Sequence, residues 1–153
     1  MRCMLAIMFF AGSAMLSAQV KKQVFVGSGV VTPWDGGSRT VSTTGGVALV
    51  VPLTQKLFMR PVVGAGSITS VKTGRSFPTI QAACLVGWRV TKRTAILGGG
   101  GSTFLFPPMA PNRVLPTAIF STATQIHGRW AVFTPVSFNE KGIGVAAQIG
   151  YTW

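Results

Sequence analysis

The chain ends with the stretch Ile143-Gly-Val-Ala-Ala-Gln-Ile-Gly-Tyr-Thr-Trp153. Counting back from Trp153, every second residue is apolar or aromatic, and the residues between them are small or polar. A period of two predicts a β-strand with one apolar face and one small or polar face. The strand also finishes on an aromatic residue. That ending favours a transmembrane barrel strand, whose terminal aromatic side chain lies at the level of the lipid headgroups.

Seven further segments with strand-like patterns precede this terminal strand. The segment 79–90 alternates most clearly, with Ile80, Cys84 and Trp88 on one face and Gln81 and Arg89 on the other. The expected strands are 23–31, 45–53, 57–69, 79–90, a fifth that begins at Arg93 and contains the glycine run 98–101, 114–126, 129–138 and the terminal strand.

The connections between these segments alternate in length. The links after the second, fourth and sixth segments are short, whereas 32–39, 70–78 and 107–113 are longer and rich in turn-forming residues. The connection 139–142 is a short hairpin. Outer-membrane barrels have an even number of antiparallel strands, short periplasmic turns and longer outer loops. The sequence therefore predicts an all-β fold, an eight-stranded antiparallel up-and-down transmembrane β-barrel.

The terminal strand resembles the carboxy-terminal signature strand of bacterial outer-membrane β-barrels, which ends in Phe or Trp with Tyr two residues earlier. Here these positions are Trp153 and Tyr151. The mature chain as a whole is similar to the small barrels of the OmpX and OmpA-transmembrane type. The resemblance implies a Gram-negative outer-membrane location and insertion by the barrel-assembly machinery. It implies no particular function, because unrelated functions share this architecture.

The first residues predict a secretory signal peptide. Arg2 precedes a short apolar run, and small residues surround Ala18. The run is shorter than the roughly 20 residues that a membrane-spanning helix needs. We expect cleavage after Ala18, so that residues 1–18 form the signal peptide and 19–153 form the barrel. An uncleaved N-terminal anchor is the alternative.

The composition is basic and hydrophobic at once. The chain has 14 Lys and Arg against 2 Asp and Glu, yet only 10% of its residues are charged and 48% are hydrophobic. A nucleic-acid-binding protein usually carries its basic residues on one face or stripe, whereas here they are scattered between apolar segments. An exported protein also meets anionic lipid rather than nucleic acid, so we expect lipid partners. Only Cys84 remains after Ala18, which excludes an intramolecular disulfide in the mature chain.

A soluble exported barrel of the lipocalin type is the rival fold, with the apolar face pointing inward. Its outer face would then have to be well charged. The residues opposite the apolar face are mostly Gly, Ala, Ser, Thr and Gln, which are too small and neutral for that role. They suit the narrow interior of an eight-stranded barrel.

Catalysis is not expected, and neither is a cofactor or metal. The chain has one histidine, His127, at an expected periplasmic turn, while both acids, Asp35 and Glu140, are on expected outer loops. The lipid A deacylase barrels use a His-x-Ser arrangement, but here Gly128 and Arg129 follow the histidine. The glycine run 98–101 lacks the Gly-Lys-Ser/Thr sequence of a phosphate loop. We interpret it as wall glycines covered by a bulky neighbour, for which Phe104, Phe133 and Trp88 are the candidates.

Two arginines, Arg60 and Arg89, point inward by strand parity, and no strand carries an acid to pair with them. An unpaired charge in a dry interior is costly. Three interpretations remain open: the lumen holds water, the side chains extend to the periplasmic mouth, or the assumed register is shifted by one. The first corresponds to a narrow, anion-favouring lumen.

Basic residues lie at both expected ends of the barrel. The outer-loop cations, which we interpret as contacts for lipopolysaccharide phosphates, are Arg39, Lys72, Arg75, Arg113 and Lys141. The periplasmic cations, which could meet anionic phospholipid, are Lys21, Lys22, Lys56, Lys92, Arg93 and Arg129. The expected aromatic girdle at the periplasmic end is Trp88, Trp130, Tyr151 and Trp153.

Two classes of function follow from these features. The first is a structural or interaction barrel that binds lipopolysaccharide, stabilises the leaflet, or packs as an accessory subunit beside a larger membrane complex. The second is a minor pore for anions or small solutes.

Overall fold

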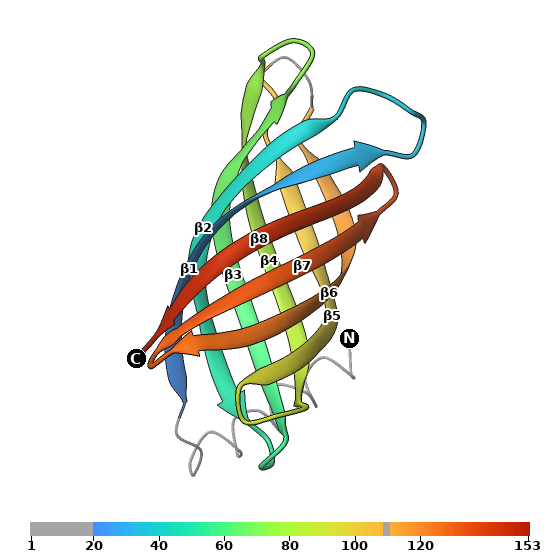
Figure 1. Cartoon of the computed structure of the whole chain (residues 1–153). Helices are drawn as coiled ribbons and strands as arrows, with labels where there is room; N and C mark the ends of the chain where they lie inside the picture. Colours follow the sequence, from blue (N-terminus) through green and yellow to red (C-terminus); the bar gives the residue numbers. More distant parts are fainter. Residues whose placement is uncertain (1–19, 109–110) are drawn as a thin grey trace.

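The computed structural model describes residues 20–108 and 111–153, so the expected signal peptide lies outside the described residues. Eight antiparallel strands close into one barrel in the order β1 to β8 (Figure 1). They are β1 (Lys21–Pro33), β2 (Thr40–Pro52), β3 (Leu57–Ser70), β4 (Ser76–Arg89), β5 (Thr94–Leu105), β6 (Arg113–His127), β7 (Trp130–Asn139) and β8 (Gly142–Thr152). The predicted eight-stranded antiparallel barrel is confirmed.

Closure of the barrel depends on the terminal strand. β8 pairs with β1 from Gln23↔Thr152 to Pro33↔Gly142, so the first and last strands form one continuous seam. The backbones of Lys22 and Trp153 exchange two hydrogen bonds of 3.1 and 2.9 Å at the end of that seam. The last residue of the chain therefore takes part in closing the wall.

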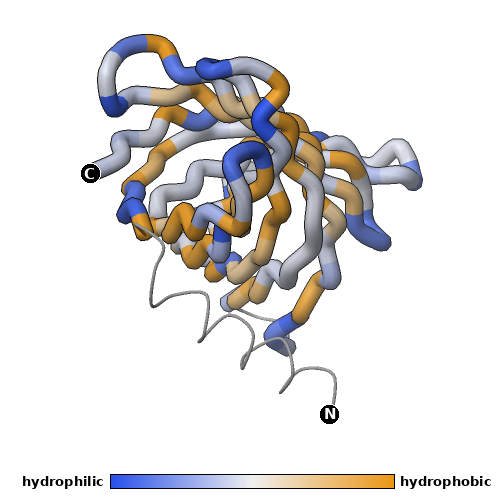
Figure 2. The backbone as a smooth tube through the Cα atoms, turned by 90° about the horizontal axis from the view of Figure 1, so that it is seen from below, coloured by the Kyte–Doolittle hydropathy of each residue, from blue (hydrophilic) through white to orange (hydrophobic). Residues whose placement is uncertain are grey.

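Side-chain direction follows the predicted period of two. On β4, Ile80, Val86 and Trp88 are exposed, whereas Thr79 and Leu85 are buried inside the barrel. Figure 2 views the barrel from the end at which β8 finishes and shows hydrophobic and hydrophilic residues interspersed along the wall. The lipocalin-like alternative is wrong, because large apolar side chains point outward rather than into the interior.

The two ends of the barrel differ as predicted. The turns 53–56, 90–93 and 128–129 lie at the end where β1 begins and β8 finishes. The longer connections, 34–39 and 71–75 among them, lie at the other end together with the short turn 140–141 (Figure 1). We call these the short-turn end and the loop end. In outer-membrane barrels they face the periplasm and the exterior respectively.

Several strands extend beyond the segments expected from the sequence, mostly toward the loop end. β2 begins at Thr40 rather than at residue 45, and β4 begins at Ser76 rather than at residue 79. The residues added to β2 are mostly Ser and Thr, and those added to β4 are Ser76, Phe77 and Pro78, so neither extension is apolar enough to continue the alternation. They nevertheless pair: Thr40 with Ser70 and Thr69 with Ser76. The barrel wall therefore continues past its apolar zone.

The glycine run on β5 lies within the wall, as predicted, but its cover was wrongly assigned. The nearest side chain to a Cβ built on Gly98 is Phe120 of β6, at 3.5 Å, and not Phe104, Phe133 or Trp88. Gly98 and Phe120 are direct pairing partners across β5 and β6. The run therefore needs no ligand to explain it.

Candidate functional site

Apolar side chains from three strands pack together inside the barrel. Phe58, Leu85, Ala95 and Leu97 form a buried cluster from β3, β4 and β5, and Leu97 is fully buried. Arg60 follows Phe58 by two residues on the same inward face of β3 and is only 4% exposed. The sequence prediction that Arg60 points inward therefore agrees with the structure.

The Arg60 side chain crosses the lumen. Its guanidinium carbon lies 4.4 Å from the ring centroid of Phe133 on β7, and 5.5 Å from that of Phe25 on β1. In a closed barrel of eight strands, β3 and β7 are on opposite walls. A cation over an aromatic face is attracted by the ring quadrupole, and more strongly when both groups are shielded from water. Arg60 therefore bridges the barrel.

Polar contacts hold one side of the guanidinium. Arg60 Nε donates to Gln23 Oε1 at 2.9 Å, and Gln23 Nε2 donates to Thr152 Oγ1 at 3.0 Å. This chain of contacts joins β3, β1 and β8 inside the barrel. Arg60 Nη2 is buried and has no hydrogen-bond partner among the residues that the structure describes. A buried donor without a partner is costly, so this atom is the least satisfied polar group of the interior.

Two cavities lie along the lumen, and Arg60 lines both. The one at the short-turn end has a volume of about 570 Å³ and is bordered by Lys21, Arg89, Arg93 and Arg129, among others. The other has about 490 Å³ and reaches the loop end, where Asp35 and Lys141 border it. Arg60 therefore lies between two spaces, each of which reaches one end of the barrel.

Arg89, the other arginine predicted to line the lumen, lies at the short-turn mouth. It is exposed, its Nη1 donates to the carbonyl of Gln55 at 3.1 Å, and its guanidinium lies 5.7 Å from the Phe58 ring. The two arginines therefore differ in where their side chains end. Arg60 stays inside the lumen, and Arg89 extends to the short-turn mouth. Neither requires the register shift.

The aromatic residues predicted for the girdle gather at the short-turn end. Trp130 and Tyr151 meet edge to face with ring centroids 5.0 Å apart, and Tyr151 stacks on Trp153 at 6.5 Å. Trp88 lies on another part of the wall, with Lys56 Nζ 6.0 Å from its ring. A belt of Trp and Tyr beside cations is typical of a membrane interface.

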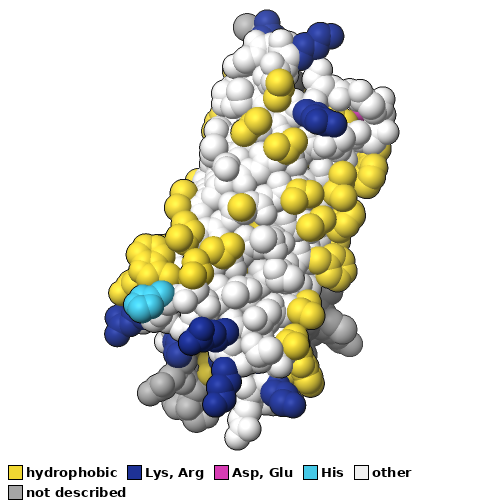
Figure 3. Space-filling view, in the orientation of Figure 1, with side chains coloured by type: hydrophobic (Ala, Val, Ile, Leu, Met, Phe, Trp, Pro, Cys, Tyr) yellow, Lys and Arg dark blue, Asp and Glu magenta, His cyan; other side chains and the backbone are white. Residues whose placement is uncertain are grey.

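The wall above this belt exposes apolar side chains. Val26, Val63 and Phe120 are 55 to 59% exposed, and Figure 3 shows hydrophobic groups over the middle of the barrel with cations gathered at its two ends. Two outward hydroxyls in this zone, Thr122 and Thr134, hydrogen-bond each other at 2.6 Å. Such pairing suits a lipid environment, where water cannot satisfy exposed polar groups.

The loop end carries the basic residues predicted to contact lipopolysaccharide. All five are exposed: Arg39, Lys72, Arg75, Arg113 and Lys141. Within residues 20–108 and 111–153 the structure contains a single ion pair, Lys141 with Glu140, at 3.5 Å. The other acid, Asp35, accepts a hydrogen bond from the backbone of Gly37 at 2.9 Å. Four of the five cations therefore have no acidic partner in the described structure.

Three of these four cations lie in two loops that are joined to each other. The backbone of Val71 donates to the carbonyl of Arg39 at 3.1 Å, which joins the β1–β2 and β3–β4 loops. Lys72 and Arg75 lie in the second of these loops. We call Arg39, Lys72 and Arg75 the basic loop patch.

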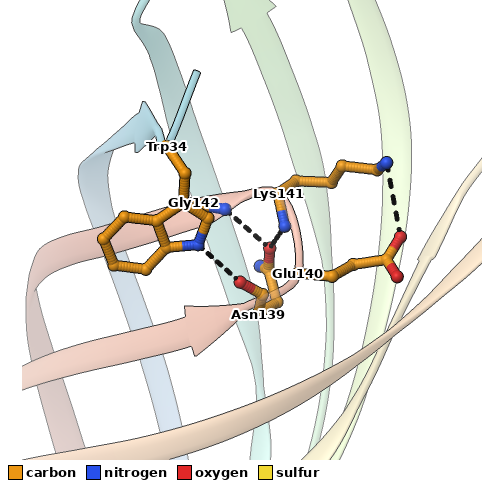
Figure 4. Close-up of polar contacts among 5 residues, drawn as sticks. All are labelled: Trp34, Asn139, Glu140, Lys141 and Gly142. Carbon is orange, nitrogen blue, oxygen red and sulfur yellow. Dashed lines mark hydrogen bonds and ion pairs between the residues drawn. The ribbon is translucent and has the colours of Figure 1, made fainter. Parts of the chain in front are cut away.

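Trp34 makes a contact for which sequence reasoning assigned no role. Its indole Nε1 donates to the carbonyl of Asn139 at 2.9 Å, while Asn139 Oδ1 accepts from the backbones of Lys141 and Gly142 (Figure 4). The contact joins the β1–β2 loop to the end of β7, next to the β7–β8 turn. A tryptophan in a loop carries no periodic signal, so the sequence could not place it.

The single histidine lies far from both acids of the described residues. His127 is exposed at the short-turn end, whereas Asp35 and Glu140 are at the loop end. No group of three His, Cys, Asp or Glu residues lies close enough to hold a metal ion within the described ranges. Cys84 is exposed on the outer wall, as its place in the β4 alternation predicts. The described part of the chain also contains no helix long and apolar enough to span a membrane.

Comparison with known proteins identifies the fold through structure alone. No family model matches the sequence, and a search of curated proteins finds no match. A de novo designed transmembrane β-barrel is 19% identical, with 86% of this chain and 95% of that chain covered and a TM-score of 0.56. The N-terminal β-barrel domain of Pseudomonas aeruginosa OprF is 6% identical, with 90% and 100% covered and a TM-score of 0.60.

The outer-membrane protein Ail of Yersinia pestis is also similar, in two forms. Its structure in phospholipid bilayer nanodiscs is 8% identical, with 88% of this chain and 100% of that chain covered and a TM-score of 0.57. Its structure in complex with the heparin analogue sucrose octasulfate is 9% identical, with 89% and 99% covered and a TM-score of 0.54. The chain has the fold of small outer-membrane β-barrels. Together with the apolar exterior, this confirms the predicted fold class and agrees with the predicted outer-membrane location.

Proposed function

We propose that this barrel is a structural, non-catalytic component of the outer membrane whose basic loop patch binds the phosphates of lipopolysaccharide. One observation carries the proposal: Arg39, Lys72 and Arg75 project from two joined loops with no acidic partner among the described residues. Bridging of neighbouring lipopolysaccharide molecules would stabilise the outer leaflet around the barrel.

The chemistry of the patch suits phosphate. Arginine binds phosphate through two parallel hydrogen bonds, and lysine adds a mobile point charge. Three cations on two joined loops can hold a ligand with several anionic groups at once, which raises its affinity beyond that of any single contact. The complex of Ail with sucrose octasulfate lends support, because that barrel of similar fold accommodates a polyanion.

A minor anion-favouring pore is the second candidate, and the two cavities that meet at Arg60 are the observation in its favour. Ion passage would require Arg60 to leave Phe133 and the Phe58–Leu97 cluster to open. The interior of the structure favours the structural role.

The test compares two triple variants reconstituted in phosphatidylcholine nanodiscs. The first changes the patch by Arg39→Gln, Lys72→Gln and Arg75→Gln. The matched control removes equal charge from two turns at the opposite end by Lys56→Gln, Lys92→Gln and Arg93→Gln. We expect the patch variant to bind purified lipopolysaccharide at least roughly tenfold more weakly, because hydrogen bonds between charged groups are lost, and the control to bind like the unchanged protein.

Dephosphorylated lipopolysaccharide tests the ligand chemistry in the same assay. It should bind the unchanged barrel as weakly as intact lipopolysaccharide binds the patch variant. Equal binding of intact lipopolysaccharide by both triple variants would show that the patch is not the receptor.

A further inference from the structure

The cavity at the loop end is lined by both apolar and polar side chains. Its volume is about 490 Å³, and its apolar lining includes Val62, Phe77, Leu115 and Ile119. Pockets for small organic molecules have this character, with mainly apolar walls and a few polar groups that fix the orientation of the ligand. The size also lies within the range of about 300 to 1,000 Å³ that is common for such pockets.

Arg60 supplies the buried charged group of this cavity. It is the only charged side chain that is buried among the described residues, at 4% exposure. Gln23 accepts from its Nε, and the faces of Phe25 and Phe133 lie near its guanidinium, yet Nη2 has no hydrogen-bond partner in the described structure. Aromatic faces and a neutral amide lessen the cost of burying this cation but provide no counter-charge.

The groups around the cavity favour an anion at Arg60. The only acid among its described lining residues is Asp35, which lies in the β1–β2 loop and already accepts from the backbone of Gly37. Gln81 and Gln148 line the same space and can donate further hydrogen bonds to an anionic group. A carboxylate would complete the arrangement, because it accepts several hydrogen bonds and neutralises the guanidinium.

We propose that the loop-end cavity binds an organic monoanion, a carboxylate carried on an apolar chain, with the carboxylate at Arg60 and the chain along the apolar wall. An inorganic anion would satisfy the charge but leave the apolar wall unused. An uncharged apolar molecule would fill the wall but leave the buried guanidinium without a counter-charge. This site is separate from the basic loop patch and does not depend on it.

The test uses octanoate as the probe and octanol as its uncharged counterpart. Binding is measured calorimetrically to the protein in phosphatidylcholine nanodiscs, and the heat of partition into protein-free nanodiscs is subtracted. We expect saturable binding of one octanoate per barrel, octanol binding at least about tenfold weaker, and sodium chloride unable to reproduce the effect. Equal binding of octanol would overturn the proposal, and so would full displacement of octanoate by chloride at equal concentration.

Variants locate the site. Arg60→Gln should weaken octanoate binding by about tenfold or more, whereas Arg60→Lys should retain part of it because the charge remains. Arg113→Gln at the loop end and Arg89→Gln at the short-turn mouth serve as matched controls and should bind octanoate like the unchanged protein. Undiminished binding by Arg60→Gln would contradict the proposal. If that variant does not fold, the comparison of octanoate with octanol on the unchanged protein still decides.

The triple variant of the basic loop patch separates this site from the proposed function. It should lose lipopolysaccharide binding and keep octanoate binding, whereas Arg60→Gln should show the reverse. Loss of octanoate binding in the patch variant would place the carboxylate at the loops and overturn its assignment to Arg60.

Discussion

Arg60 on β3 and Phe133 on β7 meet across the full width of the barrel, with the guanidinium carbon 4.4 Å from the ring centroid. Both side chains are at least 96% buried. Because the two strands lie on opposite walls, the contact links these walls through the lumen. It stabilises the closed wall and narrows the lumen at the same point, which leads to two separate predictions.

The first prediction concerns stability. Phe133→Leu keeps an apolar side chain but removes the aromatic face under Arg60, so the barrel should lose about 1 to 2 kcal/mol of unfolding free energy. Urea unfolding in phosphatidylcholine vesicles, followed by tryptophan fluorescence, measures this loss. Phe120→Leu is the matched control, because Phe120 is 58% exposed on the outer wall and contacts no cation in the described structure. Equal losses of unfolding free energy in the two variants would mean that the contact between Arg60 and Phe133 contributes nothing beyond apolar packing.

The second prediction concerns conductance. Arg60 and the cluster of Phe58, Leu85 and Leu97 fill the lumen between the two cavities, so the purified protein should give no steady current in planar bilayers. The double variant Phe58→Ala and Arg60→Ala truncates the two of these side chains that β3 carries. It should give measurable current steps. Steady anion-selective current from the unchanged protein would instead support the pore.

The sequence predicted the strands and their facing because a membrane barrel repeats one rule along its apolar zone. It did not predict where β2 and β4 begin, because the Ser- and Thr-rich extension of β2 and the Ser-Phe-Pro extension of β4 do not continue the apolar alternation. Strand parity pointed both Arg60 and Arg89 inward, but the surroundings of the two side chains differ because they lie at different depths in the barrel. Arg89 is the last residue of β4 and reaches the mouth, whereas Arg60 lies farther inside and finds Phe133 only when β7 closes the opposite wall. Such a contact depends on barrel closure, which no local pattern encodes.

The glycines of β5 provide a third prediction. A Cβ on Gly101 would lie 2.6 Å from Ala83 Cα on β4, whereas a Cβ on Gly100 would have only the Thr117 carbonyl nearby, at 3.4 Å. Gly101→Ala should therefore strain the β4–β5 pairing and cost about 1 to 3 kcal/mol, and Gly100→Ala should be tolerated. The heat-modifiability of each variant on gels measures the folded fraction. We expect a smaller fraction of the unboiled protein at the folded position for Gly101→Ala alone. Equal folded fractions for both variants would mean that β4 and β5 can move apart enough to accept a Cβ at Gly101.

Trp34 provides the last prediction, at the loop end of the seam. Its indole donates to the Asn139 carbonyl at the end of β7 (Figure 4), and its backbone donates to the carbonyl of Lys141 at 3.1 Å. The start of the β1–β2 loop is therefore joined both to β7 and to the β7–β8 turn. Trp34→Phe keeps an aromatic ring but removes the indole donor, which should free the loop that carries Arg39. Proteolysis follows the population of the open loop, so trypsin cleavage after Arg39 should become roughly two- to tenfold faster.

Peptide mapping by mass spectrometry measures this rate against Trp88→Phe, in which the changed tryptophan lies in the girdle at the other end. The control should be cleaved after Arg39 at the rate of the unchanged protein. If the Trp34→Phe loop resists trypsin as well as the unchanged loop, its backbone hydrogen bonds to Lys141 and Val71 hold it without the indole. The basic loop patch would then owe its placement to the pairing of Arg39 with Val71 rather than to the seam.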